Sequence, residues 1–346
     1  MRWLVRHTRY IVVLGALSLA TVLLLIVAYY SGGYWRDLDV NVAASIIIVI
    51  ATYLIFNPLI EGVRAASTRE HPRLDLDDFI EHIANANKEV DILDTWTRLL
   101  DSNLRERSFI AVREALKNRV AIRILLLDPE SKAAEMRTEE IGHRADVPRA
   151  IMETLLQLYR LREDLNPVLV PYFGVRIYSA SPSVQLYRWD DRALLSFFPI
   201  GRGAHETPKL ETHMLTPWGQ SVQARFDELW NDPRSITLEQ YMRMRLEVVA
   251  SGGFREQVEV DFVWLDGTCY ISEPSLMRHI AKHGIQNLEA RAEILDGDDG
   301  TMSGPEFRLA MVDDHHESLQ PVMERFDSKY GRQHDLIVCL VSPART

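Results

Sequence analysis

Polar residues follow two apolar runs in the middle of the chain, at the positions where buried strands would end. Asp94 and Thr95 lie at the end of the first run, where the strand would pass into a loop. Asp128 and Ser131 follow the second run in the same way. Loops at the carboxyl ends of parallel strands form the usual ligand crevice of an open α/β sheet, so we expect these four residues to bind a ligand. The alternative is that both aspartates only cap local turns, since an aspartate before a proline favours a turn.

The pattern around these residues predicts a β–α–β unit. Residues 90–96 and 120–128 predict strands, and the second run is apolar enough to be buried on both faces of a sheet. Residues 102–119 between them carry apolar side chains at helical spacing. A crossover helix between two strands predicts that the strands pair in parallel. Further helices are expected near residues 74–88, 149–162 and 220–232, and further strands near 175–180, 183–190, 193–200 and 212–217.

This succession resembles the phospholipase-D-like superfamily over residues 74–233, as a single copy of the family's repeat. The most specific part is residues 115–131, ALKNRVAIRILLLDPES, which is similar to the family's helix-then-strand step. The other segments that carry the resemblance are residues 90–96, 109–117, 187–191 and 226–230. The resemblance implies an α/β domain whose active members use a His-x-Lys-x-x-x-x-Asp motif. In that motif the His is the nucleophile and the Lys holds phosphate oxygens.

The segment that matches this motif lacks both reactive residues. If Asp190 is the motif's aspartate, the His and Lys positions hold Ser183 and Gln185; one residue later, they hold two apolar residues. We therefore expect a catalytically degenerate domain, a pseudoenzyme with no catalytic residue, no metal and no cofactor. Arg188 and Asp190 are further candidate ligand contacts if the strand register turns them toward the crevice. Histidines elsewhere are isolated in the sequence: His143, His205 and His213.

Two apolar runs without charge, residues 10–30 and 40–60, precede this domain. At about 1.5 Å per residue, each would form a helix long enough to cross a hydrocarbon core of about 30 Å. We therefore expect two transmembrane helices, an external loop at 31–39, and a juxtamembrane linker at 61–73. The arginines on the outer flanks place residues 1–9 and the C-terminus in the cytoplasm, which predicts a multi-pass inner-membrane protein in contact with the lipid bilayer. The rival interpretation of the first run is a cleaved signal peptide, but it is too long and lacks an A-x-A-like site.

The C-terminal part is acidic. Residues 255–346 hold nine basic and 17 acidic residues, a net charge of −8, which disfavours nucleic acid as a partner. Residues 234–253 predict a linking helix, and residues 254–346 follow the β-α-β-β-α-β order of a ferredoxin-like domain. Residues 274–295 also resemble an ACT-type regulatory domain. Two polar clusters predict surface turns and a helix start rather than metal sites: Asp296, Asp298 and Asp299, and Asp313, Asp314, His315 and His316.

These features support three hypotheses about function. The first is a membrane-anchored cytosolic sensor or effector in bacterial signalling or defence, which binds a small ligand or protein partner. The second is a membrane-bound phosphodiesterase, phospholipase or nuclease with a non-standard active site. The third is an oligomeric membrane scaffold. Because single-copy phospholipase-D-like domains commonly pair, the resemblance implies at least a homodimer.

Overall fold

The computed structural model describes residues 69–341 apart from 202, 251–253, 293–305, 313–315 and 335, together with short stretches between residues 18 and 50. The chain divides into two compact units, residues 1–67 and residues 68–346. In its described part, the second unit contains an eight-stranded sheet and a closed barrel of six strands. We call residues 69–242 the sheet lobe and residues 243–341 the barrel lobe.

The predicted membrane hairpin is wrong. In the described part of the chain, no helix combines the length and the apolar character needed to cross a membrane. The inner-membrane location, the cytoplasmic orientation of both termini and the bilayer as a partner are overturned with it. The remaining residues of 10–30 and 40–60 lie outside the described part.

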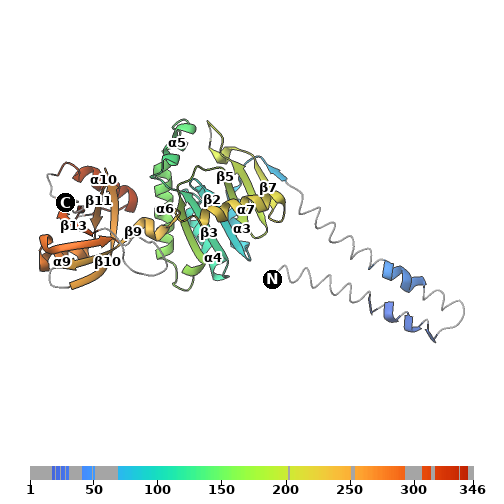
Figure 1. Cartoon of the computed structure of the whole chain (residues 1–346). Helices are drawn as coiled ribbons and strands as arrows, with labels where there is room; N and C mark the ends of the chain where they lie inside the picture. Colours follow the sequence, from blue (N-terminus) through green and yellow to red (C-terminus); the bar gives the residue numbers. More distant parts are fainter. Residues whose placement is uncertain are drawn as a thin grey trace. The chain divides into compact units, whose positions relative to one another are not determined.

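A mixed sheet forms the sheet lobe (Figure 1). Its strands are β1 Arg69–His71, β2 Glu89–Asp94, β3 Ala121–Leu127, β4 Phe173–Tyr178, β5 Val184–Trp189, β6 Arg192–Phe197, β7 Lys209–His213 and β8 Ile236–Thr237. They lie in the order β1-β7-β6-β5-β2-β3-β4-β8. Strands β2, β3 and β4 are parallel neighbours, which confirms the parallel pairing predicted from the crossover helix. Strand β5 runs antiparallel to β2 and leads into the antiparallel strands β6 and β7.

Helices cover both faces of this sheet. They are α3 Leu76–Asn85, α4 Arg105–Lys117, α5 Lys132–Glu140, α6 Val147–Glu163, α7 Pro217–Trp230 and α8 Leu238–Met242, with short 3-10 helices η1 Arg98–Leu100, η2 Val170–Tyr172 and η3 Ala204–Glu206. On one face, Phe79 of α3 meets Tyr187 of β5 edge to face at 5.0 Å. On the other face, Gln223 of α7 bonds to Arg188, the next residue of β5. Successive side chains of a strand point to opposite faces, so α3 and α7 sandwich the sheet between them.

The predicted ferredoxin-like domain is also wrong, because its strands close into a barrel. The elements are β9 Arg243–Ala250, β10 Phe254–Leu265, β11 Thr268–Ser272, α9 Pro274–His283, η4 Ile285–Asn287, β12 Leu288–Ala292, β13 Glu306–Met311, α10 Leu319–Tyr330 and β14 Val338–Val341. The sequence predicted a linking helix within residues 234–253, but among the described residues of that range only α8 is helical. Strand β9 pairs with both β10 and β12, and this double pairing closes the barrel.

Helix α10 holds the barrel lobe against the sheet lobe. The hydroxyl of Tyr330 donates to the carbonyl of Met242, 2.6 Å away, at the end of α8. The same hydroxyl accepts the N–H of Phe262 in β10 at 2.8 Å. Next to it, the Lys329 ammonium donates to the Phe262 carbonyl at 2.9 Å. One helix end therefore joins β10 to the last residue of the sheet lobe.

Candidate functional site

A cavity of about 640 Å³ opens at the carboxyl end of β2. Its wall comes from the end of β2 and the segment after it, the start of α3, strand β5, and the loop that carries η3. Its lining includes Asp94, Trp96, Arg98, Gln185 and Tyr187. Small-molecule sites in proteins usually have volumes of about 300–1,000 Å³ and few convergent polar groups. By size and by chemistry, this cavity is the candidate functional site.

Asp94 lies buried at the wall of the cavity and accepts bonds from neutral donors. Its Oδ2 atom accepts the Gln185 amide at 2.6 Å and the Tyr187 hydroxyl at 2.7 Å. Its Oδ1 atom accepts the backbone N–H of Thr95 at 2.8 Å. Burial raises the pKa of the Asp94 carboxyl from 3.8 to about 6, because the charged form loses water; the bonds from Tyr187, Gln185 and Thr95 and the charge of Lys209 limit that rise.

The strand register explains why these groups meet. Strand β5 runs antiparallel to β2 and places Tyr187 opposite Ile92 and Leu186 opposite Leu93. One more step along the ladder places Gln185 opposite Asp94. Because directly opposite residues share a face of the sheet, Asp94, Gln185 and Tyr187 point to the same side.

Behind Gln185 lies a buried lysine that the sequence analysis missed. Lys209 is only 1% exposed, and its ammonium donates to the Gln185 amide oxygen and to the Ala204 carbonyl, both at 2.6 Å. Burial lowers the pKa of Lys209 to about 8, while the charge of Asp94 opposes this shift. Gln185 therefore bridges the Asp94 carboxylate and the Lys209 ammonium, which are not bonded to each other. Lys209 also ties the loop of η3 to the site.

Asp128 and Ser131, expected beside Asp94, do not line this cavity. Asp128 accepts the backbone N–H of Glu130 at 2.9 Å. The hydroxyl of Ser131 donates to the Asp128 carbonyl at 2.6 Å and accepts the N–H of Ala134, which caps α5. These contacts match the turn-capping alternative for Asp128. Thr95, in contrast, lies buried in the cavity wall next to Asp94.

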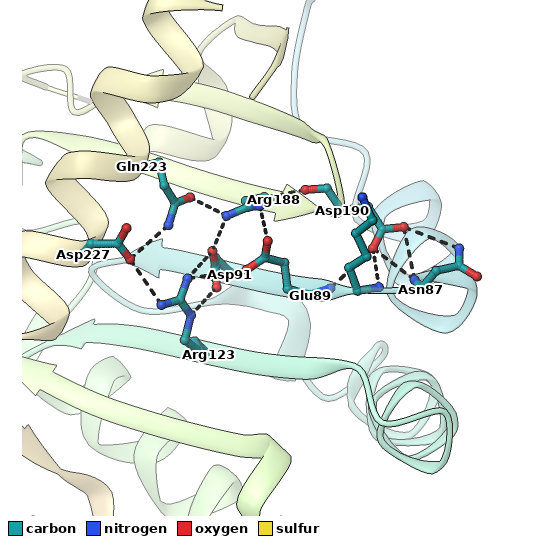
Figure 2. A network of polar contacts seen from close by, with 9 residues as sticks. Asn87, Glu89, Asp91, Arg123, Arg188, Asp190, Gln223 and Asp227 are labelled. Atoms are coloured by element: carbon teal, nitrogen blue, oxygen red, sulfur yellow. Dashed lines mark hydrogen bonds and ion pairs between the residues drawn. The ribbon is translucent and has the colours of Figure 1, made fainter. Parts of the chain in front are cut away.

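Arg188 points away from the cavity, to the face of the sheet covered by α7 (Figure 2). Its guanidinium donates to Asp91 at 3.1 Å and to Gln223 at 2.6 Å, and it also pairs with Glu89. Arg123 approaches the same carboxylate with two bonds of 2.8 Å. Asp91 is completely buried between these two guanidiniums. This arrangement compensates the buried charge of Asp91 within the protein.

Asp190 lies at the far end of β5 from the cavity and caps a loop. Its carboxylate accepts the backbone N–H of Asn87 at 3.0 Å and that of Lys88 at 2.7 Å (Figure 2). Its φ of 49° is in the left-handed region, which aspartate tolerates better than most residues. Asp190 and Gln185 therefore sit at opposite ends of one strand.

The remaining residues of interest do not gather at the cavity. Ser183 is exposed just before β5, and His143 is exposed in the turn after α5; neither lines the cavity. His213 pairs with Asp191 at 3.0 Å. The predicted turn residues 296–299 and 313–315 lie outside the described part of the chain. Among residues with described positions, no group of three or more His, Cys, Asp or Glu side chains is placed to hold a metal ion.

Comparisons with known proteins add little. No family model and no curated protein matches the sequence. Among solved structures, the chain has a likeness to TrmBL2, an archaeal chromatin protein described as binding DNA in a novel mode. The TM-score is 0.33 and the identity 12%, over 59% of this chain and 67% of that one. A likeness this low carries no argument about the fold or the partners of this chain.

Proposed function

We propose that the sheet lobe is a binding module for a small polar molecule, held in the cavity at the end of β2. The observation that carries this proposal is the buried carboxylate of Asp94 in the wall of a cavity of about 640 Å³. Burying an acid without a charged partner lowers the stability of the fold. Acids with perturbed pKa values in cavities are typical of functional sites. The mixed lining of acids, guanidiniums, an amide and aromatic rings suits a ligand with several polar groups.

We further propose that the lobe is a phospholipase-D-like domain that has lost phosphoryl-transfer chemistry. If Asp190 is the motif's aspartate, Gln185 stands at the position of the motif's lysine. The Gln185 amide is bonded to Asp94 on one side and to Lys209 on the other. An amide cannot supply the positive charge that the motif's lysine provides to phosphate oxygens. Binding without turnover suits a sensor, which responds to whether its ligand is bound.

A cavity-filling variant tests the binding proposal. Asn103 and its neighbour Ser102 are both exposed, but only Asn103 lines the cavity. The full chain and its Asn103→Trp and Ser102→Trp variants would be screened against a library of small metabolites by thermal shift. We expect at least one compound to stabilise the wild-type chain and Ser102→Trp but not Asn103→Trp. If no compound stabilises the wild-type chain, or if Asn103→Trp responds equally, the cavity is not a binding site.

An activity assay tests the loss of catalysis. The full chain would be incubated with phosphodiester and phospholipid substrates, alongside its Ser183→Ala and His143→Ala variants. We expect no turnover above buffer. Turnover that either substitution abolishes would overturn the proposal and favour an enzyme with a non-standard active site.

A further inference from the structure

Among its charged residues, the cavity wall carries a carboxylate and a guanidinium whose present partners leave them available to a ligand. The first is the carboxylate of Asp94. An ionised carboxylate accepts about four hydrogen bonds, and Oδ2 already accepts two. Among described residues, Oδ1 is approached only by Thr95, with a short bond from its N–H and a long one of 3.4 Å from its hydroxyl. The 3.4 Å contact from the Thr95 hydroxyl is the longest of the four, so a ligand donor can replace it at Oδ1, and none of the protein donors to Oδ1 is charged.

The second charge is the guanidinium of Arg98 in η1. It bonds to Asp101 at 3.0 Å, but the two side chains are 43% and 37% exposed. An ion pair this exposed contributes little, so a ligand carboxylate can replace Asp101 at small cost. The positive charge of Arg98 is also close enough to Tyr187 to oppose the burial-driven rise of that hydroxyl's pKa. Arg98 therefore lies near the hydroxyl that donates to Asp94.

Two further arginines line the cavity, the exposed Arg73 and the buried Arg137, and Arg137 is not available in this way. Arg137 is only 2% exposed, and its guanidinium donates to Glu140 at 2.8 Å and to the Pro199 carbonyl at 2.9 Å. Replacing these contacts would leave the buried guanidinium and a partly buried carbonyl without their partners, which costs more than breaking an exposed pair. Arg98 is thus a better partner for a ligand anion than Arg137.

We propose that the cavity binds a free α-amino acid, with its ammonium on Asp94 and its carboxylate on Arg98. This inference rests on the proposed binding function and names the ligand class. A simple amine would satisfy Asp94 but leave Arg98 with Asp101, and a simple acid would meet the negative charge of Asp94. A neutral polar molecule would gain from neither charge. Trp96, between the two charged residues in the sequence, offers an aromatic surface for the ligand's side chain.

The ligand itself provides the first test. The full chain would be screened by thermal shift against the twenty common amino acids. The strongest binder, its N-acetyl derivative and its amide would then be titrated by calorimetry. Charged hydrogen bonds are the strong ones, so we expect each derivative to bind roughly 10-fold or more weakly than the amino acid. Derivatives that bind as well as the amino acid would overturn the inference.

Two variants assign the ends of the ligand. Asp94→Asn should bind the amino acid and its N-acetyl derivative about equally, because the ammonium has lost its partner. Arg98→Gln should bind the amino acid and its amide about equally, for the corresponding reason at the carboxylate. Asp101→Asn is the matched control: it removes the internal competitor of Arg98, so binding should stay the same or become tighter. Discrimination that persists in Arg98→Gln would contradict the proposal, even if Asp94→Asn fails to fold.

The outcomes separate this inference from the binding function on which it rests. If no amino acid binds but a compound of another class stabilises the chain through the cavity, the cavity is a binding site and the amino-acid inference fails. If no compound of any class binds, both fail.

Discussion

Two aspartates three positions apart on β2 are both buried, yet their surroundings differ completely. Asp91 faces α7 and lies between the guanidiniums of Arg123 and Arg188 (Figure 2). Asp94 faces the cavity and accepts bonds only from neutral groups among the described residues, with Lys209 one amide away. The first carboxylate is fully compensated by its own protein, and the second is not. The comparison teaches that burial of a charged group indicates function only where its compensation is incomplete.

The largest loss of stability should come from removing Asp91, the carboxylate that the protein compensates fully. Asp91→Ala leaves two guanidiniums facing each other without their shared carboxylate, and removing one partner of a buried ion pair costs about 3–5 kcal/mol. Denaturant unfolding of the full chain should show a loss of this order, with ligand binding in the remaining folded protein unchanged. Asp227→Asn is the control, because this second partner of Arg123 is 43% exposed and should cost far less. A loss below about 1 kcal/mol for Asp91→Ala would remove the contrast between the two aspartates.

The next effect concerns pH and Asp94. Its pKa is raised to about 6 in the folded chain from 3.8, so the folded state holds this proton more tightly than the unfolded state. The resulting stability is fully present below pH 4 and is lost as the pH rises through about 6. The shift corresponds to a loss on the order of 2–3 kcal/mol.

Asp94→Asn cannot titrate, so its comparison with the wild type isolates this contribution. The unfolding free energy of both proteins would be measured between pH 4 and pH 7. We expect the stability of the wild type, relative to Asp94→Asn, to fall across this range. A constant difference would mean that Asp94 is as well compensated as Asp91, contrary to the arrangement of its donors.

A smaller effect should follow from Lys209→Met. The substitution removes the donor to the Gln185 amide oxygen, and an unsatisfied buried acceptor costs about 1–3 kcal/mol, offset in part because no ammonium is buried. The charge of Lys209 lowers the pKa of Asp94, so its removal should move the pH transition of Asp94 upward. Unfolding from pH 5 to pH 8 measures both changes, with the exposed Lys117→Met as the control. An unmoved transition would show that the charge of Lys209 does not act on Asp94.

Much of the sheet lobe could be predicted from the sequence, because its pattern is local. Apolar runs marked β2 and β3, and helical spacing marked α4 between them. The position of Asp94 at the end of β2 followed from the same pattern. Lys209 could not be found in this way, since only the pairing of β6 with β7 and β5 brings it behind Gln185. For Asp128 the sequence offered both a ligand contact and a turn cap, and the folded loop after β3 makes it a cap.

The predicted linking helix was wrong because two local signals compete in its second half. The segment of residues 243–250 is rich in Leu, Met, Glu and Arg, which favour helices. Its burial nevertheless alternates along Leu246, Val248 and Ala250, the period of a strand. The alternation prevails over the composition, and the segment forms strand β9.

The direct passage from α8 into β9 limits how this chain can be divided or recombined. Helix α8 ends at Met242 and β9 begins at Arg243, so no free spacer separates the lobes. A fragment that starts after Ala250 would deprive both β10 and β12 of a neighbour and expose two sheet edges. The barrel can therefore be transferred to another protein only together with β9. A gene fusion or duplication would have to keep that strand with the barrel.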